Sequence, residues 1–126
     1  MVVSDGILTY TPVTPTVNGN IQYHKGINAK KADYIHVVLN SHSKNTVWLT
    51  VEFRNPDAVL NSVPIDPDTE GFVTYDIKLA GKKGWSGVVE DIRVRVSTKN
   101  KEIFTNIKDY YEFDRIVFDN NPTLEN

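Results

Sequence analysis

The stretch Thr46-Val47-Trp48-Leu49-Thr50-Val51-Glu52-Phe53-Arg54 decides the fold class of this chain. Its apolar residues recur at every second position, which is the pattern of a β-strand buried on one side. The apolar set is Val47, Leu49, Val51 and Phe53, and the set facing the other way is Trp48, Thr50, Glu52 and Arg54. The segment therefore predicts a strand with one buried face and one open, mostly polar face.

Similar alternation recurs along the chain and predicts further strands at 34–40, 73–79, 91–97 and 112–119, with weaker ones at 6–11 and 20–24. In 112–119 apolar residues fall on both faces, which predicts cover on both sides. Only 56–61 and 103–110 are candidates for a helical turn. Seven or so short strands separated by turn residues favour an all-β fold, an antiparallel sandwich or jelly roll.

Length and composition narrow the function classes. The 126 residues suit a single domain over 1–126, whose ends at 1–4 and 120–126 we expect to fray. The absence of cysteine excludes disulfides, thiolate metal clusters and cysteine nucleophiles. A net charge of −2 gives no support for nucleic-acid binding. No run of residues is apolar enough for a membrane span, and the start of the sequence does not resemble a signal peptide.

Two turn motifs resemble ligand-binding loops. Residues 66–71, Asp-Pro-Asp-Thr-Glu-Gly, begin like a calcium loop, but the twelfth position is Ile77 instead of glutamate. Residues 81–87, Gly-Lys-Lys-Gly-Trp-Ser-Gly, resemble a phosphate cradle, but their spacing matches neither the dinucleotide-binding nor the P-loop pattern, and a strand follows them instead of a helix. Both segments are better interpreted as structural turns.

Catalytic patterns are weak. His24, His36 and His42 lack the spacing of a zinc site. Glu112 and Asp114 share a strand face about 7 Å apart and have the chemistry of a glycosidase pair. Such pairs are more often surface charges or structural ligands, so we expect no enzymatic activity.

Trp48 is the most informative residue for binding. Its period-two neighbours are polar, so the indole belongs to the open face of its strand. An exposed indole offers an apolar plane on which a sugar ring stacks, while hydroxyl groups bond to nearby polar side chains. The alternative is a tryptophan covered by a loop.

Arg93 and Arg95 point the same way from one strand, about 7 Å apart. This spacing suits successive carboxylate or sulfate groups of an anionic polymer. The alternative is that both arginines form salt bridges within the domain, for example with Glu112 or Asp114. His36, from another strand, is able to join either arrangement.

Several segments together resemble a known family: Asp-Gly-Ile-Leu at 5–8, residues 26–40, Phe-Val-Thr-Tyr-Asp-Ile at 72–77, Gly-Trp-Ser-Gly followed by Ile-Arg-Val at 84–94, and Phe-Asp-Arg-Ile-Val-Phe at 113–118. In this order they are similar to non-catalytic carbohydrate-binding modules with the galactose-binding-like jelly-roll fold. The match covers nearly the whole chain and carries more weight for the fold than for the ligand.

The resemblance implies that Trp85 is a packing residue and that Asp114 is buried or structural. It also implies a structural calcium ion in many relatives, which makes Asp5 and Asp114 candidate metal ligands. The same resemblance implies a covalently attached polysaccharide-degrading enzyme. It also implies a secreted or cell-surface location in bacteria. The chain departs from the family at Arg95-Val96, where Asp-Pro is common, and at Arg115, where tyrosine is common.

The expected function is therefore carbohydrate binding that targets an attached enzyme to its polysaccharide substrate. An anionic polysaccharide, a uronate or a sulfated glycan, is the expected type of ligand. If Trp48 and the two arginines do not share a surface, we expect a neutral sugar on the face formed by Trp48, Thr50, Glu52, Arg54 and Thr74. A structural or adhesive domain is the main alternative, and a small glycan-active enzyme is a weaker one. The candidate ligand-binding residues are Trp48, Thr50, Glu52, Arg54, Thr74, His36, Arg93 and Arg95.

Overall fold

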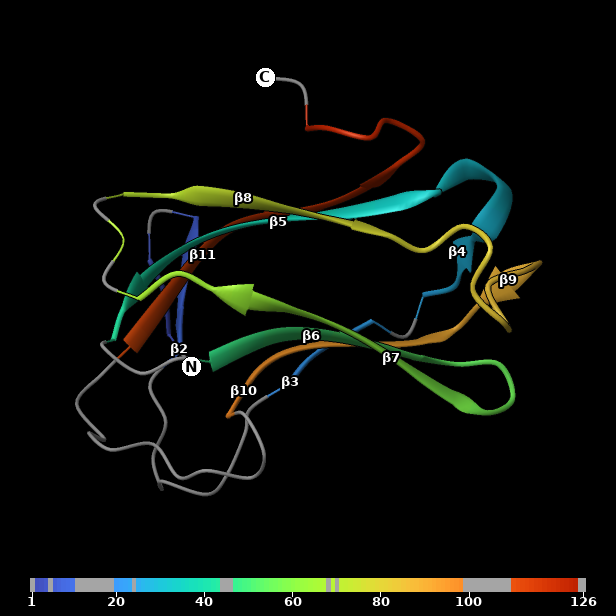
Figure 1. The fold of residues 1–126 in the computed structure, drawn as a ribbon, viewed down its shortest axis with the longest axis horizontal. Helices are drawn as coiled ribbons and strands as arrows, with labels where there is room; N and C mark the ends of the chain where they lie inside the picture. The colour runs from blue at the N-terminus through green and yellow to red at the C-terminus, as the bar shows by residue number, and fades with distance from the viewer. Residues whose placement is uncertain are drawn as a thin grey trace.

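Two antiparallel sheets pack face to face in the computed structural model, which describes residues 2–4, 6–10, 20–23, 25–43, 47–67, 69, 71–98 and 110–124 (Figure 1). The five-stranded sheet has the order β1 (Val2–Ser4), β2 (Ile7–Tyr10), β11 (Tyr110–Asp119), β5 (Tyr34–His42), β8 (Val73–Lys78). The four-stranded sheet has the order β3 (Asn20–Tyr23), β10 (Asp91–Thr98), β6 (Val47–Arg54), β7 (Ala58–Ile65). The fold is a β-sandwich.

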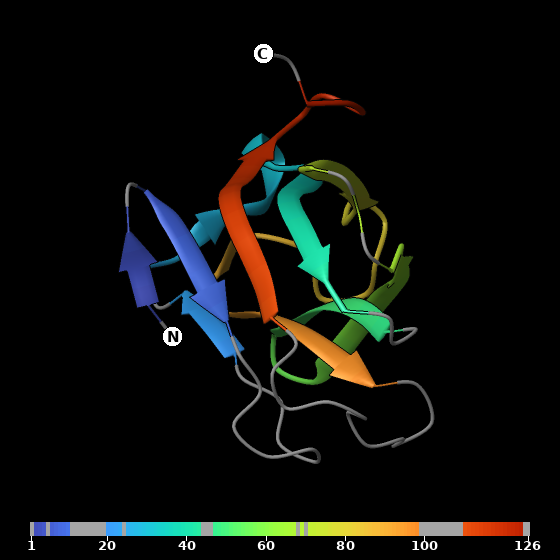
Figure 2. The ribbon, with the colours of Figure 1, turned by 90° about the vertical axis from the view of Figure 1, so that its left-hand side faces the viewer.

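Short elements close one end of the sandwich. β4 (Ile27–Asn28) pairs with β9 (Val88–Val89), and a single 3-10 turn, η1, covers Ala29–Lys31. Seen from the side, the blue strands β1 and β2 lie at one edge of the molecule and the green strands β7 and β8 at the opposite edge (Figure 2). β7 and β8 are each an edge strand of their sheet, and they contact each other, so these two edges lie side by side.

The core forms where the predicted apolar faces meet. Val47, Leu49, Val51 and Phe53 of β6 are fully buried. The opposite sheet contributes Ile35, Val37 and Leu39 of β5, which are also fully buried. All seven predicted strands are present, because a side-chain period of two places every second residue against the facing sheet.

The prediction of a helical turn at 56–61 is wrong, because residues 58–65 form β7. Val59, Val63 and Ile65 of this strand contact the core at period two. Pro64 is accommodated because β7 is an edge strand, where a missing backbone N–H breaks no ladder. Of the other predicted turn, 103–110, only Tyr110 is described, and it belongs to β11.

A β-bulge explains the mixed faces of the last strand. The register of β11 against β5 shifts between Phe113 and Arg115, so Asp114 is an extra residue. As a result Phe113, Ile116 and Phe118 all pack on the core. The mixed faces therefore arise from one apolar set that changes phase by one residue at the bulge, which the sequence prediction did not include.

The glycine-rich segment 81–87 is a structural turn built around Trp85. The buried indole Nε1 donates to the carbonyl of Ala32 at 2.8 Å, and the ring packs edge-on against Phe53. The side-chain amide of Asn55 donates to the carbonyls of Gly84 and Ser86 at 2.9 and 3.1 Å. The packing role expected for Trp85 is therefore present.

At the ends where we expected fraying, β1 pairs with β2, and Asn120 is tied to the body of the domain. Its side-chain oxygen accepts from the backbone N–H of Asp33 at 3.0 Å. In the part of the chain that the structure describes, no helix is long and apolar enough to cross a membrane.

Candidate functional site on the outer face of the four-stranded sheet

Trp48 and the two arginines of β10 share one surface. β6 and β10 are adjacent and antiparallel, with Arg95 opposite Thr50 and Arg93 opposite Glu52. Directly opposed residues in a sheet point to the same face. Since the other face of β6 is the core, the outward face carries Trp48, Thr50, Glu52, Arg54, Arg93 and Arg95. The indole of Trp48 is partly exposed on it.

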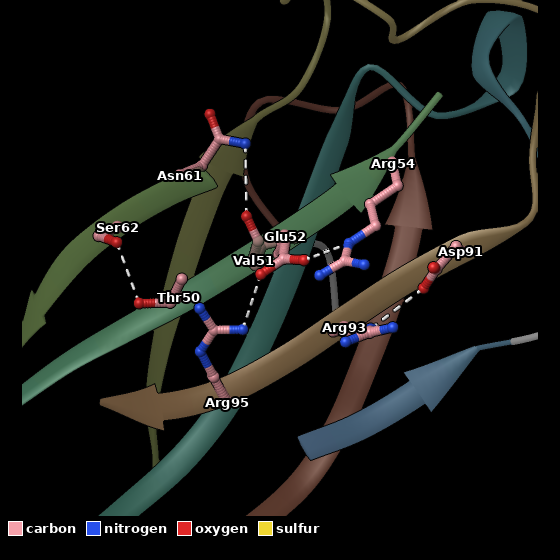
Figure 3. A network of polar contacts seen from close by, with 9 residues as sticks. All are labelled: Thr50, Val51, Glu52, Arg54, Asn61, Ser62, Asp91, Arg93 and Arg95. Atoms are coloured by element: carbon pink, nitrogen blue, oxygen red, sulfur yellow. Dashed lines mark hydrogen bonds and ion pairs between the residues drawn. The ribbon is translucent and has the colours of Figure 1, made fainter. Parts of the chain in front are cut away.

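Glu52 is the centre of a network on this face (Figure 3). Its Oε1 accepts from Nη1 of Arg95 at 2.9 Å, and its Oε2 accepts from Nε of Arg54 at 2.7 Å. The residue is only 5% exposed, whereas the side chain of Arg54 is 45% exposed. One buried carboxylate therefore fixes two guanidinium groups whose remaining N–H donors are available above the sheet.

The ionisation of Glu52 follows from these contacts. Burial alone would raise its pKa, but the hydrogen bonds and charges of Arg95 and Arg54 outweigh burial and hold the pKa below its ordinary value. Glu52 is therefore ionised at neutral pH, and the two arginines keep their orientation.

Two smaller contacts extend the network along the sheet. Nε of Arg93 donates to Oδ1 of Asp91 at 3.2 Å on the same strand. Toward the sheet edge, the hydroxyls of Thr50 and Ser62 lie 3.0 Å apart across β6 and β7. The outer face is thus polar over β10 and β6, whereas on β7 Ser62 alternates with the outward-facing Leu60 and Pro64, of which Leu60 is 55% exposed.

The prediction of an open face is wrong for two of its residues. Thr50 is 3% exposed and Glu52 is 5% exposed, although both point away from the core. The long arginine side chains lie over the sheet and cover them, as such amphipathic side chains do. The alternative of internal salt bridges for Arg93 and Arg95 is confirmed, but their partners are Asp91 and Glu52 instead of Glu112 and Asp114.

Thr74 and His36 do not belong to this surface. Thr74 lies on β8 and His36 on β5, which are neighbouring strands of the five-stranded sheet. In their register, Asp76 is opposite His36 and Thr74 is opposite Val38. Their grouping with Trp48 or with the arginines is therefore wrong. Alternation places a residue on a face of its own strand but does not assign that strand to a sheet.

His36 instead links three strands of the five-stranded sheet. Its Nδ1 lies 2.5 Å from Oδ1 of Asp76 on β8, and its Nε2 lies 2.7 Å from Oδ1 of Asp119 on β11. The ring is fully buried and stacks on Tyr34. A ring nitrogen that faces an ionised carboxylate carries a proton and donates it, so an aspartate at each ring nitrogen favours the imidazolium form of His36.

The carboxylates considered for catalysis have separate partners. Oε1 of Glu112 lies 2.5 Å from Nε2 of His42, whose ring stacks on Tyr110. Asp114 lies at the bulge, 3.7 Å from Nε of Arg115. Neither contact links the two carboxylates as an acid and base pair.

The expectation was that Asp114 is buried or structural, and its 39% exposure contradicts the first of these: as the extra residue of the bulge, it has no position in the ladder. Asp5, the other candidate metal ligand, lies outside the described residues, as does His24. Within the described ranges, no group of three or more histidine or acidic side chains is arranged to hold a metal ion. The calcium site therefore stays a prediction.

A groove at the free edges of the sandwich was missed by sequence reasoning. It has a volume of about 580 Å³ and lies between β7 and β8. Ser62 lies on one side, Lys78 on the other, and Lys82 in the turn that closes one end. The only sequence signal was the lysine pair within 81–87, which the turn interpretation set aside.

Comparisons with known proteins identify no family. A scan against protein-family models finds no match for this sequence, and a search of curated proteins finds none either.

Proposed function

We propose that this domain is a non-catalytic carbohydrate-binding module and that the outer face of the four-stranded sheet binds the sugar. The observation that carries the proposal is the position of Trp48, partly exposed on the same face as two arginines oriented by a buried glutamate. An aromatic plane beside fixed N–H donors is the combination that sugar recognition requires: stacking for the ring and hydrogen bonds for the hydroxyls.

The jelly-roll topology is part of this proposal. Strand order supports it: β2, β5, β8 and β11 belong to one sheet and β3, β6, β7 and β10 to the other. Along the chain these eight strands cross repeatedly between the sheets, as the two Greek keys of a jelly roll require. The galactose-binding-like family remains the resemblance that suggested it.

The geometry also bears on the type of ligand. A sheet face offers a flat stacking surface and does not enclose a substrate, which suits binding better than turnover. Arg93, Arg95 and Arg54 each have an internal carboxylate partner, so on this face they favour sugar hydroxyls over the anionic groups first expected for them.

Substitution of Trp48 tests the proposal. Affinity electrophoresis of the Trp48→Ala variant across a panel of soluble glycans should abolish the retardation that the parent shows, whereas Trp48→Phe should retain part of it. Phe72→Ala is the matched control, because Phe72 is an exposed aromatic residue preceding β8 of the other sheet. If Trp48→Ala migrates like the parent on every glycan that retards the parent, this face is not the site.

The wider biological role rests on the family resemblance alone. We propose that the module directs an attached polysaccharide-degrading enzyme to its substrate in a secreted or cell-surface bacterial protein. A structural calcium ion involving Asp5 and Asp114 belongs to the same proposal. A glycan array with and without chelator, together with the melting temperature in both conditions, tests the calcium ion.

A structural or adhesive domain is the competing function, and it requires an apolar self-association patch around Trp48. On the outward face of β6 the residues that follow Trp48 are Thr50, Glu52 and Arg54, all polar, which favours the sugar proposal over an apolar patch. Size-exclusion chromatography separates the two, since the adhesive alternative predicts an oligomer and the binding module a monomer.

A further inference from the structure

We propose that the groove between β7 and β8 binds the acidic groups of a carboxylated or sulfated polysaccharide that also contacts Trp48. The inference rests on the proposed function and assigns it a ligand class and a second contact region. The groove, with its volume of about 580 Å³, falls within the usual size range of ligand sites.

The arginines and the groove lysines of this domain differ in their ion pairing. All four arginines, Arg54, Arg93, Arg95 and Arg115, form ion pairs with carboxylates of the domain. By contrast, Lys78 and Lys82 in the groove are exposed, and neither has an ion-pair partner among the described residues. Other exposed lysines of the described residues also lack an ion-pair partner, but Lys78 and Lys82 are the two that line the groove, while the arginines are paired within the domain.

The one carboxylate in the groove is already engaged. Asp76 lines the groove, but its Oδ1 lies 2.5 Å from Nδ1 of the buried His36 imidazolium. With all three groups ionised, His36, Asp76 and Asp119 together carry a net charge of −1, so Lys78 and Lys82 outweigh the trio by one positive charge. A carboxylate or sulfate group fits this environment better than a cation does.

The groove is continuous with the Trp48 face. Thr50 lies two residues along β6 from Trp48, about 7 Å away, and Ser62 is the residue opposite Thr50 on β7. Ser62 contacts Thr50 on the outer face and also lines the groove. Ser62 thus joins the two regions, and the proposed path of an oligosaccharide stacked on Trp48 runs over Thr50 and Ser62 to the groove that Lys78 and Lys82 line.

An extended peptide is a poorer occupant of this edge. Strand addition to β7 needs a regular row of backbone donors, and Pro64 removes one of them. The polar side chains that line the groove, Asn61 and Ser62, instead suit the hydroxyl groups of a sugar.

The experiment compares the Lys78→Gln/Lys82→Gln variant with the parent on two pairs of glycans. One pair is polygalacturonate and its methyl ester, and the other is a sulfated galactan and its desulfated form, so the arms distinguish carboxylate from sulfate. The control is Lys25→Gln/Lys31→Gln, which has the same net charge but changes lysines that do not line the groove.

We expect the groove variant to bind at least one acidic glycan roughly three- to tenfold more weakly than the parent, with a smaller salt dependence. Its affinity for the neutral forms should be unchanged, and the control should match the parent throughout. Circular dichroism checks the fold of each variant, which should match that of the parent because substitutions of exposed lysines rarely alter stability.

Three results overturn the inference. In the first, the groove variant binds acidic glycans as tightly as the parent does. In the second, the parent binds acidic and neutral forms equally. In the third, polyglutamate binds as tightly as the glycans and its binding depends on the same lysines. Each leaves the proposed function intact if Trp48→Ala still abolishes glycan retardation. A parent that no glycan retards contradicts the proposed function itself.

Discussion

His36 and Asp119 are 83 positions apart in the sequence, yet Nε2 of the histidine lies 2.7 Å from Oδ1 of the aspartate. Asp76 completes the arrangement at the other ring nitrogen. Burial alone would lower the pKa of His36, but the hydrogen bonds and charges of the two aspartates outweigh burial and raise the pKa above 6.5. The Asp119 pKa is lowered, chiefly by its hydrogen bond to His36.

The first prediction is a pH-dependent contribution of His36 to stability. Because the pKa of His36 is raised in the folded state, the histidine contributes its full stabilisation of the fold below the unfolded-state value of 6.5. This contribution is lost as pH rises through the folded-state pKa. On the acid side it persists until pH falls through the lowered pKa of Asp119. The melting temperatures of the parent and of His36→Gln should therefore differ most on the acid side of pH 6.5 and converge at alkaline pH.

Thermal unfolding followed by circular dichroism at a series of pH values measures this difference. Asp76→Asn serves as an independent check, because it removes one carboxylate and should shift the NMR titration midpoint of His36 downward. Parallel melting curves for parent and His36→Gln at all pH values would show that the histidine is not an imidazolium.

The second prediction concerns Glu52. Replacement by glutamine removes the charge that holds Arg54 and Arg95, and leaves a buried polar group with poorer partners. We expect Glu52→Gln to lose about 1–3 kcal/mol of unfolding free energy. Because the pKa of Glu52 is lowered, the loss should be full above pH 4.5 and should shrink as pH falls through the folded-state value.

Urea denaturation of Glu52→Gln beside Asp91→Asn measures this effect. Asp91 pairs with Arg93 at 3.2 Å in a more exposed position, so its loss should cost less than about 1 kcal/mol. Equal losses of unfolding free energy in the two variants would mean that the burial of Glu52 does not strengthen its ion pairs with Arg54 and Arg95.

The third prediction separates two glycines in the turn at 81–87. Gly81 and Gly84 both have a positive φ, +82° and +86°, which strains any other residue. A Cβ at Gly84 would lie 2.9 Å from the carbonyl oxygen of Asn55, whereas a Cβ at Gly81 meets nothing within 4 Å. We expect Gly81→Ala to cost about 1 kcal/mol and Gly84→Ala at least about 2 kcal/mol.

Chemical denaturation of the two variants decides this point. Because the backbone strain is common to both, the excess loss in Gly84→Ala reports the collision with Asn55. If Gly81→Ala proves the more destabilising of the two, the close approach of these loops is not present in solution.

Alternation was enough to locate the strands that carry the core, because every second residue of β5 and β6 is apolar. It failed at β7, where Pro64 and Asn61 interrupt the apolar pattern of an edge strand. In β11 the spacing of Phe113, Ile116 and Phe118 already contained the phase change of the bulge, although it was interpreted as cover on both faces.

The candidate site was only partly predictable, since period two gives the direction of a side chain and not the neighbour of its strand. The sequence therefore predicted that Trp48 and Glu52 share a face. It could not show that Arg95 lies beside them or that Thr74 lies on the other sheet. The contacts of His36 depend on three strands that meet only in the folded domain.

The position of β11 has a consequence for synthesis. It lies between β2 and β5, although both precede it in the chain, so the five-stranded sheet is not assembled in the order in which its strands leave the ribosome. Until residues 110–119 are available, β2 and β5 lack their shared partner, and the apolar faces of both sheets lack part of their cover. The domain should therefore gain its stability late and cooperatively, with few productive contacts made early.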